Sequence, residues 1–520
     1  MRNRLIGACV AALATLAAMA GLATQARAIP LDPCDRFWAA SINPDTLADA
    51  NFNYPDEYAS YWGTSWTDGL PEGAELVLKG RFPHARYMSF NTYNFNQAPA
   101  SRGPNDSLPD TGIVPDPGST NPFVPGNPRD SDDRDYTIKI VSGAPPEDPA
   151  DRPPNTLYTG RDAGLGVTLV YRIYLTDDGA SIDGDAGLPT AELHLADGTV
   201  ISGGSGICSA LSVEELGGSQ GLLPVTSYAR LRTKTLVDGV LSDEPPPPAH
   251  PSIETPRWER WFNYLYSVVG QFYEPYPGFS NPLGDRSALS PAATGGPLSN
   301  KDATAMIAFG DRSFGDLMVI RGRAPTYPRT YGGDSQAGTG QVRYWSFCQN
   351  EFESSAFTDC VFDEDVPIGR KGRYTIVTGD PSDRPRNARA KCGVAWLDWP
   401  TVGDGARDYE VGGDPFGIPG TLLPPEKGGR REMGFLAYRQ ILSSPDYGQA
   451  LENVAEPGTE AQVMGEYMPT SKYVSTRQFR KRGCSRPHRR DHRAHRAHRA
   501  HHGHANGKKG RGRGAQRRHH

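Results

Sequence analysis

The residues of this 520-residue chain that are best suited to bind a ligand lie in two similar blocks of sequence. Each block has a Lys/Arg-Gly-Arg segment that ends at Arg81 or Arg323, and a following Arg-Tyr segment that ends at Tyr87 or Tyr344. Because a planar guanidinium group pairs well with carboxylate or phosphate, Arg81, Arg323, Arg152 and Arg384 are candidates for an anion-binding cleft. Tyr87 and Tyr344 are further candidate ligand-binding residues. The alternative, which we favour, is structural: the arginines pair with neighbouring acids, and the Asp-Arg-Pro-x-Asn segments at 151–155 and 383–387 form turns.

Aromatic residues are dense near the N-terminus, where five lie within 13 residues: Tyr54, Tyr58, Tyr61, Trp62 and Trp66. Short polar residues separate them. Aromatic faces beside polar groups suit a carbohydrate or another small amphipathic ligand, so Trp62 and Trp66 are candidate ligand-binding residues. Packing against a sheet is the favoured alternative.

Four acidic residues crowd a glycine-containing loop: Asp177, Asp178, Asp183 and Asp185. Carboxylate oxygens on a loop suit calcium outside the cell, although the spacing does not match an EF-hand. A solvated acidic loop is the favoured alternative. Apart from calcium, we expect no cofactor.

The chain offers little support for nucleophilic catalysis. It has no Gly-x-Ser-x-Gly segment, and only three of its 12 histidines precede the C-terminal tail. We therefore expect an envelope-associated or ligand-binding module of unknown activity rather than an enzyme. The alternative is a secreted hydrolase that uses Asp or Glu residues between two lobes; the sequence does not single out such a pair.

The elements that must position these residues are strands. Four short segments recur in one order in both halves: the two parts of each block, Tyr-Thr-Ile at 136–138 and 374–376, and Asp-Arg-Pro-x-Asn. They are rich in β-branched and aromatic residues and bounded by turn formers. The 59 glycines and 46 prolines favour turns over long helices. We predict a mostly β fold with two related antiparallel β-sandwich (jelly-roll-like) lobes and a few accessory helices.

The predicted lobes span residues 29–241 and 257–476, and a proline-rich linker at 242–256 joins them. A helix is predicted after Thr255, with Trp258 and Trp261 on one face, and a second helix over residues 433–442. We expect the two tryptophans to pack between the lobes.

The N-terminus predicts export. Residues 1–28 combine an Arg-containing start, an apolar stretch and an Ala-Arg-Ala cleavage site, which is typical of a signal peptide. No later apolar run reaches the roughly 18 residues of a membrane helix, so no transmembrane segment is expected in the mature chain. The protein is therefore predicted to be secreted or to reside in the periplasm or cell envelope.

Six cysteines follow the predicted signal peptide, and export favours disulfides. Cys348 and Cys360 are the best candidate pair, because they flank a short acidic turn between strand-like segments. Cys34 and Cys208 are the second candidate pair. The sequence leaves the state of Cys392 and Cys484 open.

Charge is divided along the chain. Residues 29–476 hold 36 basic and 59 acidic residues, a formal charge of −23. The tail at 477–520 holds 16 Lys or Arg residues, one Asp and nine of the 12 histidines. Its lack of apolar residues predicts disorder. An anionic envelope polymer or surface is its expected partner, whereas metal capture by His and a merely solvated tail are the alternatives.

Several of these segments together resemble exported bacterial domains of unknown function whose pattern runs Tyr-Pro, Phe-Pro, Phe-Trp-Ser, Tyr and Arg-x-Tyr. The matching segments are Tyr54-Pro55, Phe82-Pro83, Tyr87-Met88-Ser89, Tyr93 and Arg172-Ile173-Tyr174, with Tyr344-Trp345-Ser346 in the second half. Met88 departs from the pattern, which has Trp there. The resemblance covers about half of the body and implies an exported β-rich fold, and it brings no assigned catalytic residue.

Overall fold

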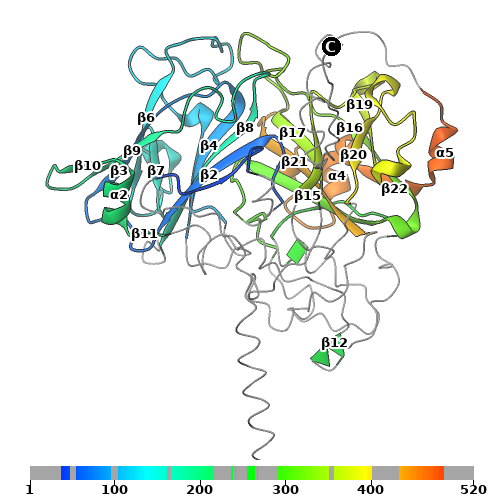
Figure 1. Ribbon diagram of the computed structural model, residues 1–520, viewed down its shortest axis with the longest axis horizontal. Coiled ribbons are helices and arrows are strands. Elements are labelled where there is room, and N and C mark those ends of the chain that lie inside the picture. Colours follow the sequence, from blue (N-terminus) through cyan, green and yellow to red (C-terminus); the bar gives the residue numbers. More distant parts are fainter. Residues whose placement is uncertain are drawn as a thin grey trace, which may run out of the picture.

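The fold consists of two β-sandwich lobes that lie side by side (Figure 1). The computed structural model describes residues 37–46, 54–94, 103–160, 166–214, 236–237, 240–241, 254–263, 266–267, 291–296, 298–350, 357–400 and 433–484. The predicted signal peptide, most of the predicted linker and residues 485–520 lie outside these ranges.

The first lobe packs a six-stranded inner sheet on a five-stranded outer sheet. The inner sheet has the order β1 (Ala40–Ile42), β2 (Ala59–Trp66), β8 (Val167–Thr176), β4 (Ala85–Asn94) and β5 (Asp106–Pro109), with β11 (Val213–Glu214) also paired to β2. The outer sheet has the order β10 (Val200–Ser202), β9 (Thr190–His194), β3 (Glu75–Arg81), β6 (Asp135–Val141) and β7 (Thr156–Tyr158). A hairpin of β12 (Leu236–Val237) and β13 (Val240–Leu241) follows.

The second lobe repeats this arrangement. Its inner sheet has the order β14 (Glu259–Arg260), β15 (Ala303–Asp311), β21 (Met433–Ser443), β17 (Val342–Asn350) and β18 (Phe357–Phe362). Its outer sheet has the order β20 (Ala395–Asp398), β19 (Arg373–Gly379), β16 (Leu317–Arg323) and β22 (Thr470–Val474). Strands β2 to β9 thus occupy the same sheet positions as β15 to β22, which confirms the predicted pair of related sandwiches. One strand pair in each outer sheet, β6–β7 and β19–β20, is parallel.

The recurring Gly and Tyr residues of the sequence are cross-strand partners. Gly80 lies opposite Tyr136 in the first lobe, and Gly322 lies opposite Tyr374 in the second. A side-chain carbon added at Gly80 would lie 2.6 Å from the Tyr136 hydroxyl, and one at Gly322 would likewise collide with Tyr374. Glycine is therefore required in both blocks because a tyrosine ring crosses the backbone there.

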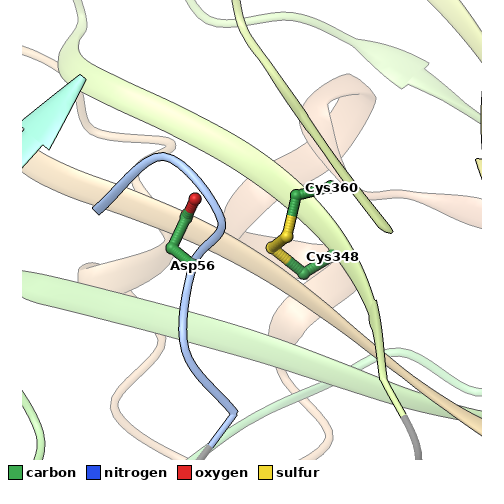
Figure 2. Close-up of side chains that lie close together, drawn as sticks. All are labelled: Asp56, Cys348 and Cys360. Carbon is green, nitrogen blue, oxygen red and sulfur yellow. A yellow bond between two sulfur atoms is a disulfide. The ribbon is translucent and has the colours of Figure 1, made fainter. Parts of the chain in front are cut away.

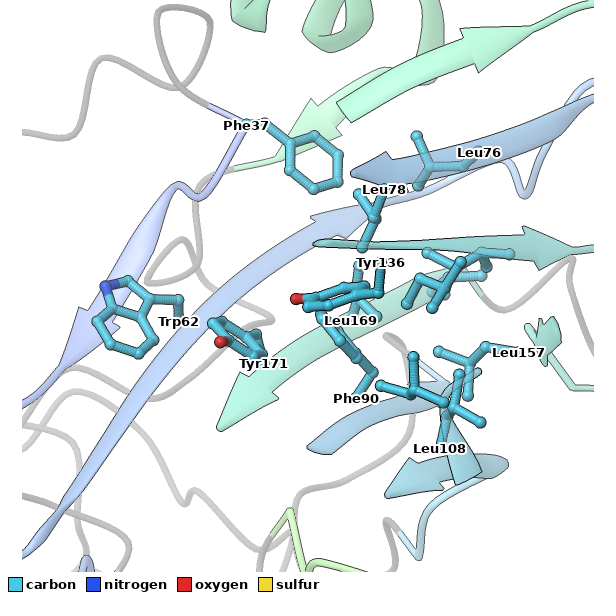
Figure 3. Packing of buried hydrophobic residues seen from close by; sticks show 14 of the residues in the cluster. Phe37, Trp62, Leu76, Leu78, Phe90, Leu108, Tyr136, Leu157, Leu169 and Tyr171 are labelled. Carbon is cyan, nitrogen blue, oxygen red and sulfur yellow. The ribbon is translucent and has the colours of Figure 1, made fainter. Parts of the chain in front are cut away.

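Each lobe has its own hydrophobic core between its two sheets. In the first lobe, leucines of the outer sheet meet aromatic residues of the inner sheet, as Figure 3 shows for Leu76, Leu78, Phe90 and Tyr171. Phe90 and Tyr171 stack with ring centroids 4.7 Å apart. An equivalent core in the second lobe gathers around Trp345, Phe347 and Tyr438.

The inner sheets are buried on both faces, because one face packs on the outer sheet and the other faces the second lobe. Strand β8 shows the consequence. Its odd positions, such as Tyr171 and Ile173, point into the lobe core, and its even positions, such as Arg172 and Tyr174, face the other lobe.

Helices are short: α2 (Gly204–Leu211), α4 (Glu460–Met464) and α5 (Thr476–Arg480). Both helices predicted at specific positions are wrong where the structure describes them. Residues 433–443 form the central strand β21, whose burial on both faces gives an apolar run without strand alternation. Trp258 and Trp261 flank strand β14 instead of lying on one helical face. No helix in the described ranges is long and apolar enough to cross a membrane.

Two disulfides link described residues. Cys348 and Cys360 join the neighbouring strands β17 and β18, as predicted. Cys392 pairs with Cys484, a connection that the sequence left open. Cys34 lies outside the described residues, so its pairing with the buried Cys208 stays a prediction.

The described fold extends beyond the predicted start of the tail at residue 477. Ser475 caps helix α5, Phe479 is buried in a small cluster of the second lobe, and Cys484 closes the second disulfide. The boundary predicted from the charge pattern lies too early in the chain. Arg477 and Arg480 belong to the amphipathic helix α5, which buries the aromatic ring of Phe479.

Candidate functional site

The two tyrosines predicted as ligand residues lie in the seam between the lobes and are fully buried. Tyr87 of the first lobe donates a hydrogen bond to Asp302 of the second, at 2.8 Å. Tyr344 of the second lobe donates to Asp56 of the first, at 3.1 Å. Each tyrosine therefore joins the lobes through a carboxylate.

The arginines that precede these tyrosines form a reciprocal set of ion pairs across the seam. Arg86 contacts Asp363 at 2.9 Å and also binds Glu364, while Arg343 contacts Asp110 at 3.4 Å. Burial raises the pKa of Asp110 to about 6, an effect that Arg343 opposes. The paired Arg-Tyr segments thus hold the lobes together.

The remaining predicted arginines lie elsewhere. Arg81 and Arg323 are about half exposed on the outer sheets of different lobes, where Arg81 lies 3.4 Å from Asp135 and Arg323 binds Glu466. Arg152 pairs with Asp106, and Arg384 donates to the carbonyl of Ala388. The structure does not bring Arg81 and Arg323 together, and these contacts match the structural role that we favoured.

A cavity of about 240 Å³ opens between the two inner sheets. Its walls come from β1, β2 and β8 of the first lobe and from β14, β15, β21 and the 291–301 region of the second. The described lining residues are Ser41, Ile42, Tyr54, Pro55, Tyr61, Trp62, Gly63, Pro104, Thr168, Val170, Arg172, Tyr174, Arg260, Trp261, Ala293, Thr294, Gly295, Gly296, Leu298, Ser299, Asn300, Lys301, Ala303, Thr304, Ala305 and Arg439. We call this space the interlobe cavity.

The charge of the interlobe cavity is one-sided. Four of its described lining residues are basic, namely Arg172, Arg260, Lys301 and Arg439. None of the described lining residues is Asp, Glu, His or Cys. This positive lining is unexpected in a body whose formal charge is −23.

Arg172 and Arg439 hold equivalent positions in the two lobes. Each lies on the central strand of an inner sheet, opposite Ser89 and Ser346 respectively. Each also donates to a backbone carbonyl of the other lobe, Arg172 to Leu298 and Arg439 to Tyr54. Both guanidinium groups therefore lie at the cavity wall with their positions set by both lobes.

Two tyrosine hydroxyl groups lie beside these arginines. The Tyr61 and Tyr174 hydroxyl oxygens are 3.1 Å apart, and the Arg172 guanidinium carbon lies 5.9 Å from the centre of the Tyr61 ring. Burial raises the pKa of both tyrosines, and the positive charge of Arg439 lowers it in part. Both tyrosines therefore carry their hydroxyl protons at neutral pH.

The predicted aromatic platform is divided along strand β2, although Trp62 and Trp66 lie on the same face of it. Trp66 is fully buried in the core of the first lobe, whereas Trp62 contributes both to that core and to the cavity wall. Trp261, which we expected between the lobes, also lines the cavity, and its ring lies 5.3 Å from that of Tyr54.

A second group of buried polar residues lies near the first disulfide, where Asp56 faces Cys348 and Cys360 (Figure 2). The cysteine sulfur atoms are bonded to each other, so they are not thiolate ligands for a metal. The Asp56 carboxylate instead accepts from Tyr344 and, at 2.5 Å, from Ser346. This group is therefore a structural hydrogen-bond centre.

The acidic loop predicted for calcium brings only two of its carboxylates, those of Asp183 and Asp185, together. Asp177 pairs with Arg129, Asp178 accepts from Tyr331, and Asp183 and Asp185 both bond to Ser181. Among the described residues, no three of these carboxylates come within 4.8 Å of one another. Calcium binding there stays a prediction.

Sequence reasoning did not select Arg172, Tyr174 or Arg439 as site residues. The Arg-x-Tyr pattern at 172–174 was visible, and the near-continuous apolar run around Arg172 signals a strand with two buried faces. Arg439 was hidden because its segment was interpreted as a helix.

The comparisons with known proteins give distant structural similarity only. No protein-family model matches the chain, and no curated protein matches it significantly. Among solved structures, a crystal structure of an uncharacterized protein from Burkholderia cenocepacia is similar, with 12% sequence identity and a TM-score of 0.42, covering 87% of this chain and 86% of that chain. A likeness at this level carries no conclusion about function.

Proposed function

We propose that the protein is an exported, envelope-associated binding module that holds a small amphipathic ligand in the interlobe cavity. The observation that supports this proposal best is the cavity itself, because it lies where the lobes meet and combines aromatic walls with polar groups. Its volume of about 240 Å³ exceeds the roughly 150 Å³ that accommodates benzene in a protein interior. A ligand of one ring with a short substituent is therefore the appropriate size.

The alternative of a hydrolase with an Asp or Glu pair has less support. A glycoside hydrolase of this kind needs two carboxyl groups roughly 5–9.5 Å apart that face the substrate. Carboxylates are absent from the described lining of the cavity, and the nearby Asp56 and Asp302 are bonded to tyrosine hydroxyl groups. We therefore favour binding over catalysis.

Filling the cavity tests the proposal. Ala305 lines it, so Ala305→Trp places a large side chain where the ligand would lie. Thr190→Trp, on an exposed position of β9, is the matched control. Saturation-transfer NMR with benzyl alcohol, glucose and 3-phenylpropionate measures binding to the native protein and both variants.

We expect at least one probe to bind the native protein and the control but not the filled variant. If Ala305→Trp does not fold, Ser41→Phe fills the cavity from strand β1. Binding that survives filling, or the failure of all three probes, would show that the cavity is not a ligand site.

Association with the envelope is attributed to the chain after Cys484. Residues 485–520 contain 12 Lys or Arg residues and one Asp, so their attraction to an anionic surface must weaken as salt rises. Export agrees with the two disulfides and with the resemblance to exported bacterial domains. Retention on anionic vesicles, measured with and without residues 485–520 at two salt concentrations, tests this role.

A further inference from the structure

We infer that the ligand of the interlobe cavity is a small amphipathic carboxylate, bound by Arg172, Arg439 and the Tyr61–Tyr174 hydroxyl pair. The inference rests on the proposed function, because it names the ligand class of the same cavity. Three independent features of the described residues carry it.

The first feature is the lack of a charge partner for Arg172. Its side chain is almost fully buried, and its three hydrogen bonds, each 2.7 Å long, go to the neutral oxygen atoms of Asn91, Tyr93 and Leu298. No described carboxylate lies within ion-pair distance. A buried cation is costly unless an anion accompanies it, so this position favours a negatively charged ligand.

The nearest acids do not remove this imbalance. Asp302 interacts electrostatically with Arg172 but is bonded to Tyr87 and Ser107, and burial raises its pKa. Asp56 lies 3.8 Å from Arg439, and the Arg439 Nη1 atom is buried without a hydrogen-bond acceptor. Arg439 thus keeps one buried N–H group without a hydrogen-bond acceptor.

The second feature is a hydrogen-bond count. The backbone N–H of Asp56 donates to the Tyr61 hydroxyl, which is itself bonded to the Tyr174 hydroxyl. Two hydroxyl groups provide two protons, and only one of them is used between the two oxygen atoms. Whichever tyrosine donates to the other, one O–H donor remains without an acceptor among the described residues.

The third feature is the apolar wall. Ile42, Val170 and Trp261 line the same cavity as the arginines. Guanidinium groups bind planar carboxylates through two parallel hydrogen bonds, and the apolar wall covers an aromatic or short aliphatic body. A carboxylate on a ring-sized body satisfies all three features.

Calorimetry with four matched probes tests the ligand class: 3-phenylpropionate, 3-phenylpropanol, 3-phenylpropylamine and phenyl phosphate. We expect the carboxylate to bind at least about tenfold more tightly than the alcohol, which is the range of a charge-assisted hydrogen bond. The amine is expected to bind most weakly. Tyr174→Phe should reduce carboxylate affinity severalfold, and Arg172→Met should bring the carboxylate-to-alcohol ratio close to one.

Arg373→Met, an exposed arginine of β19, is the charge-matched control and should leave all affinities unchanged. Because Arg172 is buried, Tyr174→Phe keeps the inference testable if Arg172→Met does not fold. Equal binding of alcohol and carboxylate, or tighter binding of the amine or the phosphate, would refute the carboxylate assignment while the cavity remained a ligand site. Failure of every probe would refute the proposed function as well.

Discussion

Glu57 provides a quantitative test of the electrostatics at the lobe seam. It follows Asp56 and accepts a hydrogen bond of 3.0 Å from the backbone N–H of Cys360 in the other lobe. Burial, together with the negative charges of Asp56, Asp365 and Asp398, raises the pKa of Glu57 from 4.5 to about 7. The folded state therefore holds this proton more tightly than the unfolded state, and stability falls as the pH rises from about 4.5 to 7.

The substitution Glu57→Gln removes this cost while keeping an oxygen acceptor for Cys360. With a folded pKa of about 7 and an unfolded value of 4.5, ionised Glu57 destabilises the fold by about 1 kcal/mol at pH 5 and about 3 kcal/mol at pH 8. We therefore expect the free energy of unfolding of the variant, relative to that of the native protein, to rise by about 2 kcal/mol from pH 5 to pH 8.

Urea denaturation of both proteins at pH 5 and pH 8 measures the free energies of unfolding. Because the two chains share every other titrating group, the difference between their pH profiles isolates Glu57. Glu466→Gln, at an exposed position paired with Arg323, is the control for replacing one carboxylate with an amide. Parallel profiles for Glu57→Gln and the native protein would show that Glu57 is not desolvated by the seam.

Three further predictions concern the seam, the disulfides and the tail. Arg86→Met leaves Asp363 buried without its cation, so the free energy of unfolding should fall by about 3–5 kcal/mol, whereas Arg323→Met at the surface should cost far less. Similar losses of the two variants in denaturation would contradict the buried-pair argument. Replacing both cysteines of Cys392–Cys484, which spans 92 residues, with serine should lower the free energy of unfolding by about 5 kcal/mol. The same change at Cys348–Cys360, which spans 12 residues, should lower it by about 3 kcal/mol, and the reverse order would rule out a chain-entropy origin. Deleting residues 485–520 should leave the melting temperature unchanged, whereas deletion from residue 477 should lower it, because Phe479 and Cys484 are then lost. Equal melting temperatures of the two deletion variants would mean that α5 contributes nothing to stability.

Fold class was predictable because it depends on local patterns. Short β-branched and aromatic segments bounded by Gly, Pro and Asp predicted strands, and their recurrence predicted two related lobes. The Cys348–Cys360 pair followed from two strands joined by a short turn. The strand β21 was missed because a strand buried on both faces lacks the alternation that distinguishes strand from helix.

The candidate site was only partly predictable. Tyr87 and Tyr344 were selected from the repeat, but burial in the seam makes them lobe-to-lobe contacts. Arg81 and Arg323 stand in equivalent places of the two lobes, and equivalence in sequence does not bring residues together in space. Trp62, predicted to bind a ligand, lines the cavity wall, and its role in binding stays a prediction; Trp66, four positions further along β2, belongs to the lobe core.

The amino-acid order by itself determined the strands of the recurring segments, the division into two similar halves and the basic C-terminal segment, since these follow from the properties of neighbouring residues. Only the tertiary structure decided which charges lack a partner. Arg172 and Arg86 are both arginines on inner-sheet strands, yet Arg86 meets two carboxylates of the opposite lobe and Arg172 meets none among the described residues. That difference arises from the docking of two sheets distant in sequence, and it creates the positive cavity on which the proposed function depends.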